Sequence, residues 1–217
     1  MRLHVSHRNR PGAFRGRSSR VYDFAARRLL RGFYRRVAAD LAPSIPTGAT
    51  VLDVGTGPGV LLVELARRRP DVRLTGVDLS PDMIAAASRN LREYGERTTA
   101  RVGDATELPF PDDSFDVIVS SLSLHHWDHP ERAAGELARV LRPAGRLFVY
   151  DFPFAPFDKL TAAAHAEPLF AAQSPERARF RAGRLHLLRC DRYVLTARPA
   201  RTSPEAAPST GTAVPEW

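Results

Sequence analysis

The most informative part of the chain reads Val51-Leu52-Asp53-Val54-Gly55-Thr56-Gly57-Pro58-Gly59, a short apolar run followed by three closely spaced glycines. The apolar run predicts a buried strand, and the helical pattern from Val60 onward places the glycines in a tight strand-to-helix turn. Such a turn presents free backbone N–H groups and a helix N-terminus at the carboxyl end of a strand, so a ligand can lie directly on the main chain. For a lone pair of glycines, an ordinary tight turn is the alternative.

Strand and helix patterns alternate on both sides of this turn. Further strands are predicted over residues 73–78, 100–102, 115–120 and 146–151, and helices over residues 21–41, 60–69, 81–95 and 130–141. Alternation of this kind predicts a parallel sheet with helices on both faces, because right-handed crossovers join parallel neighbours. The predicted fold class is therefore α/β, a doubly wound and mostly parallel seven-stranded sheet.

The two ends of the chain differ from this central part. Residues 156–182 have a helical pattern, and residues 185–189 and 193–198 bracket Cys190-Asp191-Arg192 as an antiparallel C-terminal hairpin. Residues 1–19 are basic and interrupted by Gly and Pro, which predicts a disordered leader. Residues 199–217, rich in Pro, Ala, Ser and Thr, are predicted to be a disordered tail. One domain over residues 20–198 remains.

Length and composition exclude several classes of protein. A chain of 217 residues fits one domain, and 43% hydrophobic with 26% charged residues is close to the soluble globular average. No apolar stretch approaches the roughly 20 residues that a membrane span needs. The first thirty residues contain no apolar run typical of a secretory signal, and the single Cys190 cannot form an internal disulfide. These features predict a soluble protein of a reducing cytoplasm.

The net charge of +8 raises the question of nucleic-acid binding, but the charge is unevenly distributed. Residues 1–36 contain 11 Arg and one acidic residue, whereas residues 37–217 contain 21 basic and 23 acidic residues. The body of the protein is therefore close to neutral. Because segments of like charge are usually disordered, the arginines of the first segment favour a solvated tail over a nucleic-acid arm.

Three features around the glycine turn favour a nucleoside without a diphosphate. Asp78 ends the next strand, where a carboxylate can accept hydrogen bonds from both ribose hydroxyls. The third glycine of a dinucleotide site is replaced by Val60, and Gly59 comes too early, which weakens the NAD interpretation. Asp53 stands inside the first strand, and because a buried unpaired carboxylate is costly, it should have a partner such as a ligand ammonium group. A ligand with ribose, adenine, an ammonium group and no pyrophosphate is S-adenosylmethionine.

Several further motifs occur in the same order as in a known family. They are Gly76-Val77-Asp78-Leu79-Ser80-Pro81-Asp82-Met83, Gly103-Asp104-Ala105 before Leu108-Pro109-Phe110, Phe115 to Ser121 with Leu124-His125-His126-Trp127, and Glu136 to Leu147 with the turn Pro143-Ala144-Gly145. Together with residues 51–59, this series resembles the class I S-adenosylmethionine-dependent methyltransferases, in the small-molecule branch that includes quinone-biosynthesis enzymes. The resemblance covers about residues 21–198. It implies a Rossmann-like methyltransferase fold and methyl transfer to an oxygen, nitrogen or carbon of a small metabolite.

The resemblance also implies a set of residues that bind the cofactor, S-adenosylmethionine. They are Asp53, Gly55, Thr56, Gly57, Gly59, Asp78, Leu79, Met83, Asp104, Ala105, Ser120 and Ser121. The glycines are expected against the methionine portion, Asp78 at the ribose, and Leu79 and Met83 against adenine or ribose. Asp104 and Ala105 are expected at the adenine edge, and the exit of the fourth strand at the ammonium group.

Methyl transfer from a sulfonium is an in-line displacement that needs positioning and, for many acceptors, a general base. His125 and His126 follow the fourth strand, near the point where the methyl group should emerge, and are the best candidates. A structural role is the alternative that the sequence favours, with one histidine packed and the other exposed. No metal site is predicted, because His165 and His186 lack metal-ligand spacing with other ligand residues.

The acceptor is expected to be recognised by residues 1–35 and 152–183. Six apolar residues in the second segment suggest an apolar or aromatic small molecule: Phe152, Phe154, Phe157, Leu160, Leu169 and Phe170. A nucleic-acid methyltransferase is the alternative that the basic leader suggests, but Ser121-Leu122-Ser123-Leu124 stands where the adenine-targeting members have Asn-Pro-Pro-Tyr, so nucleic acid is an unlikely partner. A protein that binds the cofactor without turnover is the other alternative. The oligomeric state is not predicted.

Overall fold

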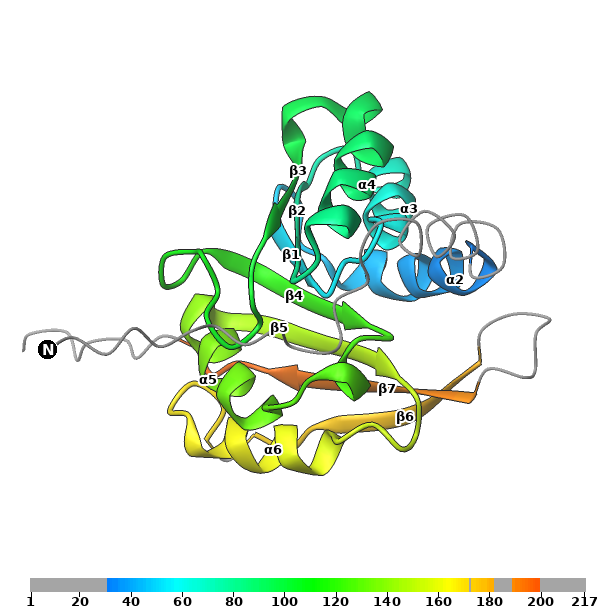
Figure 1. Cartoon of the computed structure of the whole chain (residues 1–217). Coiled ribbons are helices and arrows are strands. Elements are labelled where there is room, and N and C mark those ends of the chain that lie inside the picture. Colours follow the sequence, from blue (N-terminus) through cyan, green and yellow to red (C-terminus); the bar gives the residue numbers. More distant parts are fainter. Residues whose placement is uncertain (1–30, 172, 182–188, 200–217) are drawn as a thin grey trace, which may run out of the picture.

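The computed structural model describes residues 31–171, 173–181 and 189–199, and within them it forms one seven-stranded sheet in the order β3-β2-β1-β4-β5-β7-β6 (Figure 1). The strands are β1 (Thr50–Val54), β2 (Arg73–Asp78), β3 (Thr98–Val102), β4 (Phe115–Ser121), β5 (Leu141–Asp151), β6 (Glu176–Arg181) and β7 (Arg189–Thr196). The first five strands run parallel, and β7 runs antiparallel to both β5 and β6. The predicted doubly wound sheet and its antiparallel C-terminal hairpin are confirmed.

Helices cover both faces of this sheet. They are α2 (Arg31–Leu41), α3 (Val60–Arg68), α4 (Pro81–Leu91), α5 (Pro130–Val140) and α6 (Phe157–Ala166), with 3₁₀ turns over Ala42–Ser44, Arg92–Arg97 and Leu124–His126. Buried residues of α2, α3 and α4 form one apolar core with the sheet, and buried residues of α5 and α6 form the other (Figure 1). Burial of these two layers supplies the main stabilisation of the fold. None of the helices in the described ranges is long and apolar enough to cross a membrane.

The strand order reverses direction next to β1, which lies between β2 and β4. In doubly wound sheets the crossover helices leave from opposite faces at such a point, and a crevice opens beyond the carboxyl ends of the strands. The glycine turn after β1 and Asp78 at the end of β2 both lie at this crevice, because Val54 and Val77 are register partners. The sheet topology therefore brings the two predicted ligand-binding motifs together.

The start of α4 follows the sequence signals closely. Ser80 is the N-cap, its hydroxyl accepts a hydrogen bond from the Met83 amide at 3.4 Å, and Pro81 takes the first helical position. The helix ends at Leu91, slightly earlier than predicted, and a 3₁₀ turn continues to Arg97. Gly95 adopts φ 63° there and turns the chain toward β3.

The prediction for the C-terminal region is wrong in its boundaries. Residues 176–181 form strand β6 and not the end of a helix, and Cys190-Asp191-Arg192 lies inside β7 and not in a turn. Phe180 and Cys190 are register partners, and both are buried in the core of the α2 face. Contact with this core selects the strand conformation. The predicted leader, residues 21–30 of the first predicted helix, and residues 200–217 lie outside the described residues.

Cys190 is a core residue and not part of the predicted hairpin turn. Its side chain is buried, and this burial, with Asp151 and Asp191 nearby, raises the pKa of the thiol to about 12. Because the thiolate is the reactive form, this cysteine is an inert core residue at neutral pH.

Candidate cofactor and methyl-transfer site

The glycine turn after β1 is shaped by left-handed backbone and by close packing. Gly55 and Thr56 donate their amides to the Val77 carbonyl oxygen at 2.8 and 3.0 Å, which fixes the turn to β2. Gly55 has φ 74°, and a Cβ at this position would collide with the Ser123 side chain. Gly57 also has positive φ, but the space beside it is open. The backbone therefore favours glycine at Gly55 and Gly57, as it does at Gly59 with φ 74°, and main-chain atoms stay uncovered at Gly57.

Asp78 is held in one orientation by two backbone amides. Its Oδ2 accepts from Gly57 N and its Oδ1 from Ser80 N, both at 2.9 Å. Burial raises the pKa of the carboxyl group, and the two amides and nearby His126 oppose that shift. Each carboxylate oxygen keeps a further lone pair, so the group can still accept hydrogen bonds from two neighbouring hydroxyls of a ligand.

Asp53 lies beneath the glycine turn. Its Oδ2 accepts from the Thr56 hydroxyl at 2.7 Å, while Oδ1 is buried and has no hydrogen-bond partner within the described part of the chain. Burial raises the pKa of this carboxyl group to about 7, against the lowering effect of Thr56. The expectation that Asp53 needs a partner is confirmed for one oxygen. The other retains unused acceptor capacity that suits a cationic ligand.

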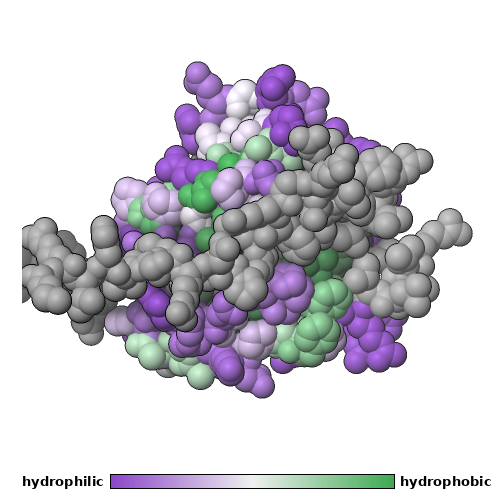
Figure 2. Space-filling view, viewed as in Figure 1, coloured by the Kyte–Doolittle hydropathy of each residue, from purple (hydrophilic) through white to green (hydrophobic). Residues whose placement is uncertain are grey.

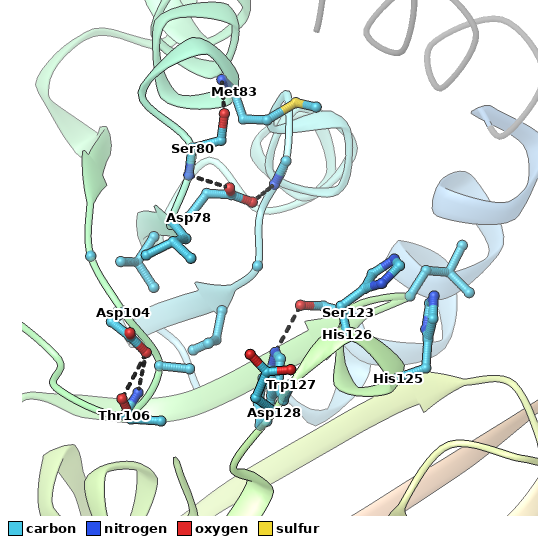
Figure 3. A pocket seen from close by; sticks show the side chains of 18 of the residues that line it. Asp78, Ser80, Met83, Asp104, Thr106, Ser123, His125, His126, Trp127 and Asp128 are labelled. Atoms are coloured by element: carbon cyan, nitrogen blue, oxygen red, sulfur yellow. Dashed lines mark hydrogen bonds between the residues drawn. The ribbon is translucent and has the colours of Figure 1, made fainter. Parts of the chain in front are cut away.

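The pocket at the carboxyl ends of β1, β2 and β4 has a volume of about 470 Å³ (Figure 3). Figure 3 shows Asp78 and Asp104 on one side of it, with His125 and His126 across from them. Asp104 accepts from both the amide and the hydroxyl of Thr106, at 2.9 and 2.8 Å, and so forms a tight turn at the pocket wall. The volume suits a nucleoside-sized ligand.

Nine of the predicted site residues line this pocket. They are Gly55, Gly57, Asp78, Leu79, Met83, Asp104, Ala105, His125 and His126. Asp53 and Thr56 lie buried beneath the turn, Gly59 begins α3 against Ala87, and Ser120 and Ser121 are buried in β4. From the β4 exit, Leu122 and Ser123 reach the pocket wall instead.

The sequence interpretation missed some of the wall of the pocket. Gly103, Thr106, Leu122, Ser123, Asp128 and His129 also line it. Ser123 packs on Gly55 and accepts from the Trp127 indole N–H at 3.0 Å. Ser123 lies three residues beyond the predicted strand end at residue 120 and two beyond the observed end at Ser121, so its nearness to the carboxyl end of the strand could have been recognised from the sequence. The described residues contain no group of three or more side chains arranged to hold a metal ion.

The two histidines have different surroundings. His125 Nδ1 lies 2.7 Å from Asp151 Oδ1, and its backbone amide donates to Asp151 Oδ2 at 3.2 Å. Asp151 is fully buried at the end of β5. His126 is exposed, and partial desolvation together with the adjacent His125 ring lowers its pKa. The ring centroids of the two histidines are 3.9 Å apart. His125 is therefore oriented by a carboxylate, as a general base commonly is.

Most of the apolar residues expected to recognise the acceptor are core residues. Phe157, Leu160 and Phe170 are buried between α6 and the sheet, and Leu169 packs partly against the same core. The interpretation of these four as pocket residues is wrong, because they fill the layer that joins α6 to the sheet. Phe152 and Phe154 remain near the pocket, and both contact the His125 ring.

Known proteins are similar to this chain in sequence and in fold. Residues 52–149 match the family described as a methyltransferase domain. The demethylmenaquinone methyltransferase of Thermus thermophilus is 38% identical over 138 residues, which cover 62% of each chain. The malonyl-[acyl-carrier protein] O-methyltransferase of Herminiimonas arsenicoxydans is 42% identical over 134 residues, covering 60% of this chain and 46% of that protein. The chain thus matches about half to three fifths of the length of these relatives.

A solved structure extends the likeness to the whole fold. The SAM dependent methyltransferase of Aquifex aeolicus superposes with a TM-score of 0.64 at 19% identity, over 85% of this chain and 98% of that one. Over residues 52–149 the chain is similar to methyltransferases, and its fold is that of solved methyltransferases described as S-adenosylmethionine-dependent.

Proposed function

We propose that the protein transfers a methyl group from S-adenosylmethionine to an oxygen, nitrogen or carbon nucleophile of a small apolar or aromatic metabolite. The observation that carries this proposal is the contact between His125 Nδ1 and buried Asp151, 2.7 Å long, at the wall of the nucleoside pocket. The pocket alone does not distinguish an enzyme from a protein that only binds this cofactor. A histidine oriented by a carboxylate beside it is suited to proton transfer.

The pocket residues fit the cofactor by their chemistry. Asp78 would accept from the ribose hydroxyls, and the uncovered main chain at Gly57 would lie against the methionine portion. Asp104 and Ala105 would meet the adenine edge. The unpartnered Oδ1 of Asp53 marks a place where positive charge beneath the turn is favourable. When bound, S-adenosylmethionine supplies an electrophilic methyl group on a sulfonium centre.

His125 would take the proton that the acceptor loses. The carboxylate of Asp151 places the ring proton on Nδ1, which leaves the Nε2 lone pair free to accept a proton from the acceptor. That proton would move to Nε2 as the acceptor is methylated, and Asp151 would stabilise the resulting imidazolium. Alignment of the acceptor would contribute the larger part of the lowering of the activation barrier, since positioning is worth roughly 7–11 kcal/mol.

Radiolabel transfer tests the proposal. Purified protein is incubated with methyl-labelled S-adenosylmethionine and either a small-molecule extract or total RNA, and label is expected in the small-molecule fraction. His125→Ala and Asp151→Asn should lower the transfer rate by about 10²-fold, the usual size of general-base catalysis, and change cofactor affinity less than about twofold.

His165→Ala is the matched control, because His165 lies on α6 and contacts the Gln173 carbonyl oxygen away from the pocket. A full transfer rate in His125→Ala would show that this histidine is not the base. Label in RNA would support the nucleic-acid alternative. Cofactor binding without transfer to either fraction would support a non-catalytic binding protein.

A further inference from the structure

Phe154 is an exposed aromatic residue beside the proposed base. Its side chain is 75% exposed, while the neighbouring apolar residues of α6 are buried. An isolated apolar residue on a surface needs no explanation, but an exposed aromatic ring in contact with His125, which lines the pocket, is one that a ligand can cover. Figure 2 shows hydrophobic surface at the end of the sheet where β5 lies, next to strongly hydrophilic surface.

Phe152, Phe154 and His125 form a compact aromatic group. The two phenylalanine rings are parallel, with an interplanar angle of 8° and centroids 5.2 Å apart. The His125 ring meets both of them edge-on, at centroid distances of 5.1 and 6.1 Å. Since Phe152 occupies one face of Phe154, the opposite face is left for a third ring in the same stack.

Hydrogen bonds hold the segment that carries these rings in place. The Phe152 amide donates to Asp151 Oδ1 at 2.7 Å, so the carboxylate that orients His125 also anchors this segment. The Ala155 amide donates to the Phe152 carbonyl oxygen at 2.9 Å, and Ala155 is buried. Arg177 of β6 donates to the Pro153 carbonyl oxygen at 3.0 Å. The turn therefore presents Phe154 outward in a fixed position relative to His125.

We infer that Phe154 is the platform on which the methyl acceptor stacks a planar ring, and that it makes the site select aromatic over saturated acceptors. This inference rests on the proposed function, because it places the acceptor on the aromatic group that Phe154 forms with Phe152 and His125. A ring stacked on Phe154 would join the aromatic group that contains His125, whose ring centroid lies 6.1 Å from that of Phe154. Phe154 is a positioning residue, since it would align the acceptor without taking part in proton transfer.

Two probes with the same bicyclic carbon skeleton, one aromatic and one saturated, test the platform. The dissociation constants of 2-naphthol and trans-decahydro-2-naphthol are measured by calorimetry on the full chain saturated with S-adenosylhomocysteine. The naphthol should bind several-fold more tightly than its saturated analogue. Phe154→Leu, which stays apolar but lacks a ring, should weaken naphthol binding about fivefold and leave the saturated probe within about twofold, as expected for the loss of one aromatic pair.

Phe154→Tyr should restore the preference, and Phe110→Leu, which alters an aromatic pair with Phe115 outside the pocket, is the matched control. An unchanged ratio of the two probes in Phe154→Leu would overturn the inference, as would absence of naphthol binding while S-adenosylhomocysteine still binds. These measurements need no turnover. If the protein does not transfer methyl groups, the ratio of the two dissociation constants can still be measured. If the inference about Phe154 is wrong, cofactor binding and methyl transfer are still observed.

Discussion

Asp78 shows how a single residue can join the architecture of the pocket to ligand binding. The two amides that it accepts come from the glycine turn and from the N-cap of α4, so the carboxylate is oriented before a ligand arrives. A carboxylate fixed in this way loses little conformational entropy when it accepts hydroxyl groups. The same geometry also explains how burial can raise its pKa without leaving it unpaired.

Replacing Asp78 with Ala should weaken binding of S-adenosylhomocysteine by about 10- to 100-fold, because hydrogen bonds to a charged group contribute roughly 1.5–3 kcal/mol each. The midpoint of thermal unfolding should fall by only a few degrees, since the two amides that lose a partner are next to the solvent-filled pocket. Calorimetric titration and a thermal melt provide both values. Glu96→Ala, an exposed acidic residue after α4, is the control, and unchanged affinity in Asp78→Ala would contradict the ribose assignment.

Asp53 should make the stability of the cofactor-free protein depend on pH. The pKa rises from 3.8 to about 7 on folding, so the folded state binds a proton more tightly than the unfolded state. Its contribution is fully present below about pH 4 and is lost as the pH rises through 7. Relative to Asp53→Asn, wild-type stability should therefore decline by on the order of 3 kcal/mol from pH 4 to pH 8. Urea unfolding at several pH values tests this, and parallel curves for the two proteins would exclude the raised pKa.

At the scale of elements, the glycine turn shows two different reasons for glycine. One is left-handed backbone, and the other is the lack of space for a side chain, which the sequence alone does not reveal. Gly55 and Gly57 both have positive φ, but only at Gly55 would a Cβ collide with Ser123. Gly57→Ala should cost about 1–2 kcal/mol of stability from the left-handed backbone, and Gly55→Ala clearly more. Adding Ser123→Gly should recover the difference in Gly55→Ala and none of the loss in Gly57→Ala. Denaturant unfolding of the four variants measures this, and equal losses at both glycines would rule out the collision.

Strands that end at a distinctive residue, such as a glycine or an aspartate, could be predicted from the sequence. The strands over residues 50–54 and 73–78 are apolar runs that end in Gly55 and Asp78, so pattern and marker agree. Strand β6 has no such marker. Its one buried residue, Phe180, packs against Phe33 and Tyr150, and both of these residues are distant in the sequence. The local pattern therefore predicted a helix, and only these distant contacts select the strand.

The site shows the same division. The cofactor side depends on residues that follow directly after β1 and β2, and it could be predicted once these strands were recognised. The contact between His125 and Asp151 depends on the pairing of β4 with β5, where Ser121 and Tyr150 are register partners. Only this register brings residues 26 positions apart to the same level of the sheet. The sequence offered His125 as a candidate but not its pairing with Asp151.

At the scale of the whole molecule, the two ends of the sheet have different tasks. The carboxyl ends hold the pocket, while at the amino ends Asp116 joins three strands. Its Oδ2 accepts from Thr50 N at 2.7 Å and from the Thr50 hydroxyl at 2.9 Å, and Arg142 Nη1 lies 2.8 Å away. These contacts connect β1, β4 and β5 at the end of the sheet opposite the pocket.

Asp116→Asn should therefore lower stability and leave ligand binding unchanged. Burial favours a raised pKa for Asp116, but the Thr50 amide and the Arg142 guanidinium outweigh it, and the pKa is lowered. The carboxylate thus contributes stability that is present above the unfolded pKa of about 4 and is lost as the pH falls through the folded value. Because the side chain is partly exposed, the loss at pH 7 should be about 1 kcal/mol and should shrink toward pH 3. Affinity for S-adenosylhomocysteine should stay within twofold, in contrast to Asp78→Ala. A large loss of affinity in Asp116→Asn would show that the two ends of the sheet are coupled, and that the pocket depends on strand alignment throughout the molecule.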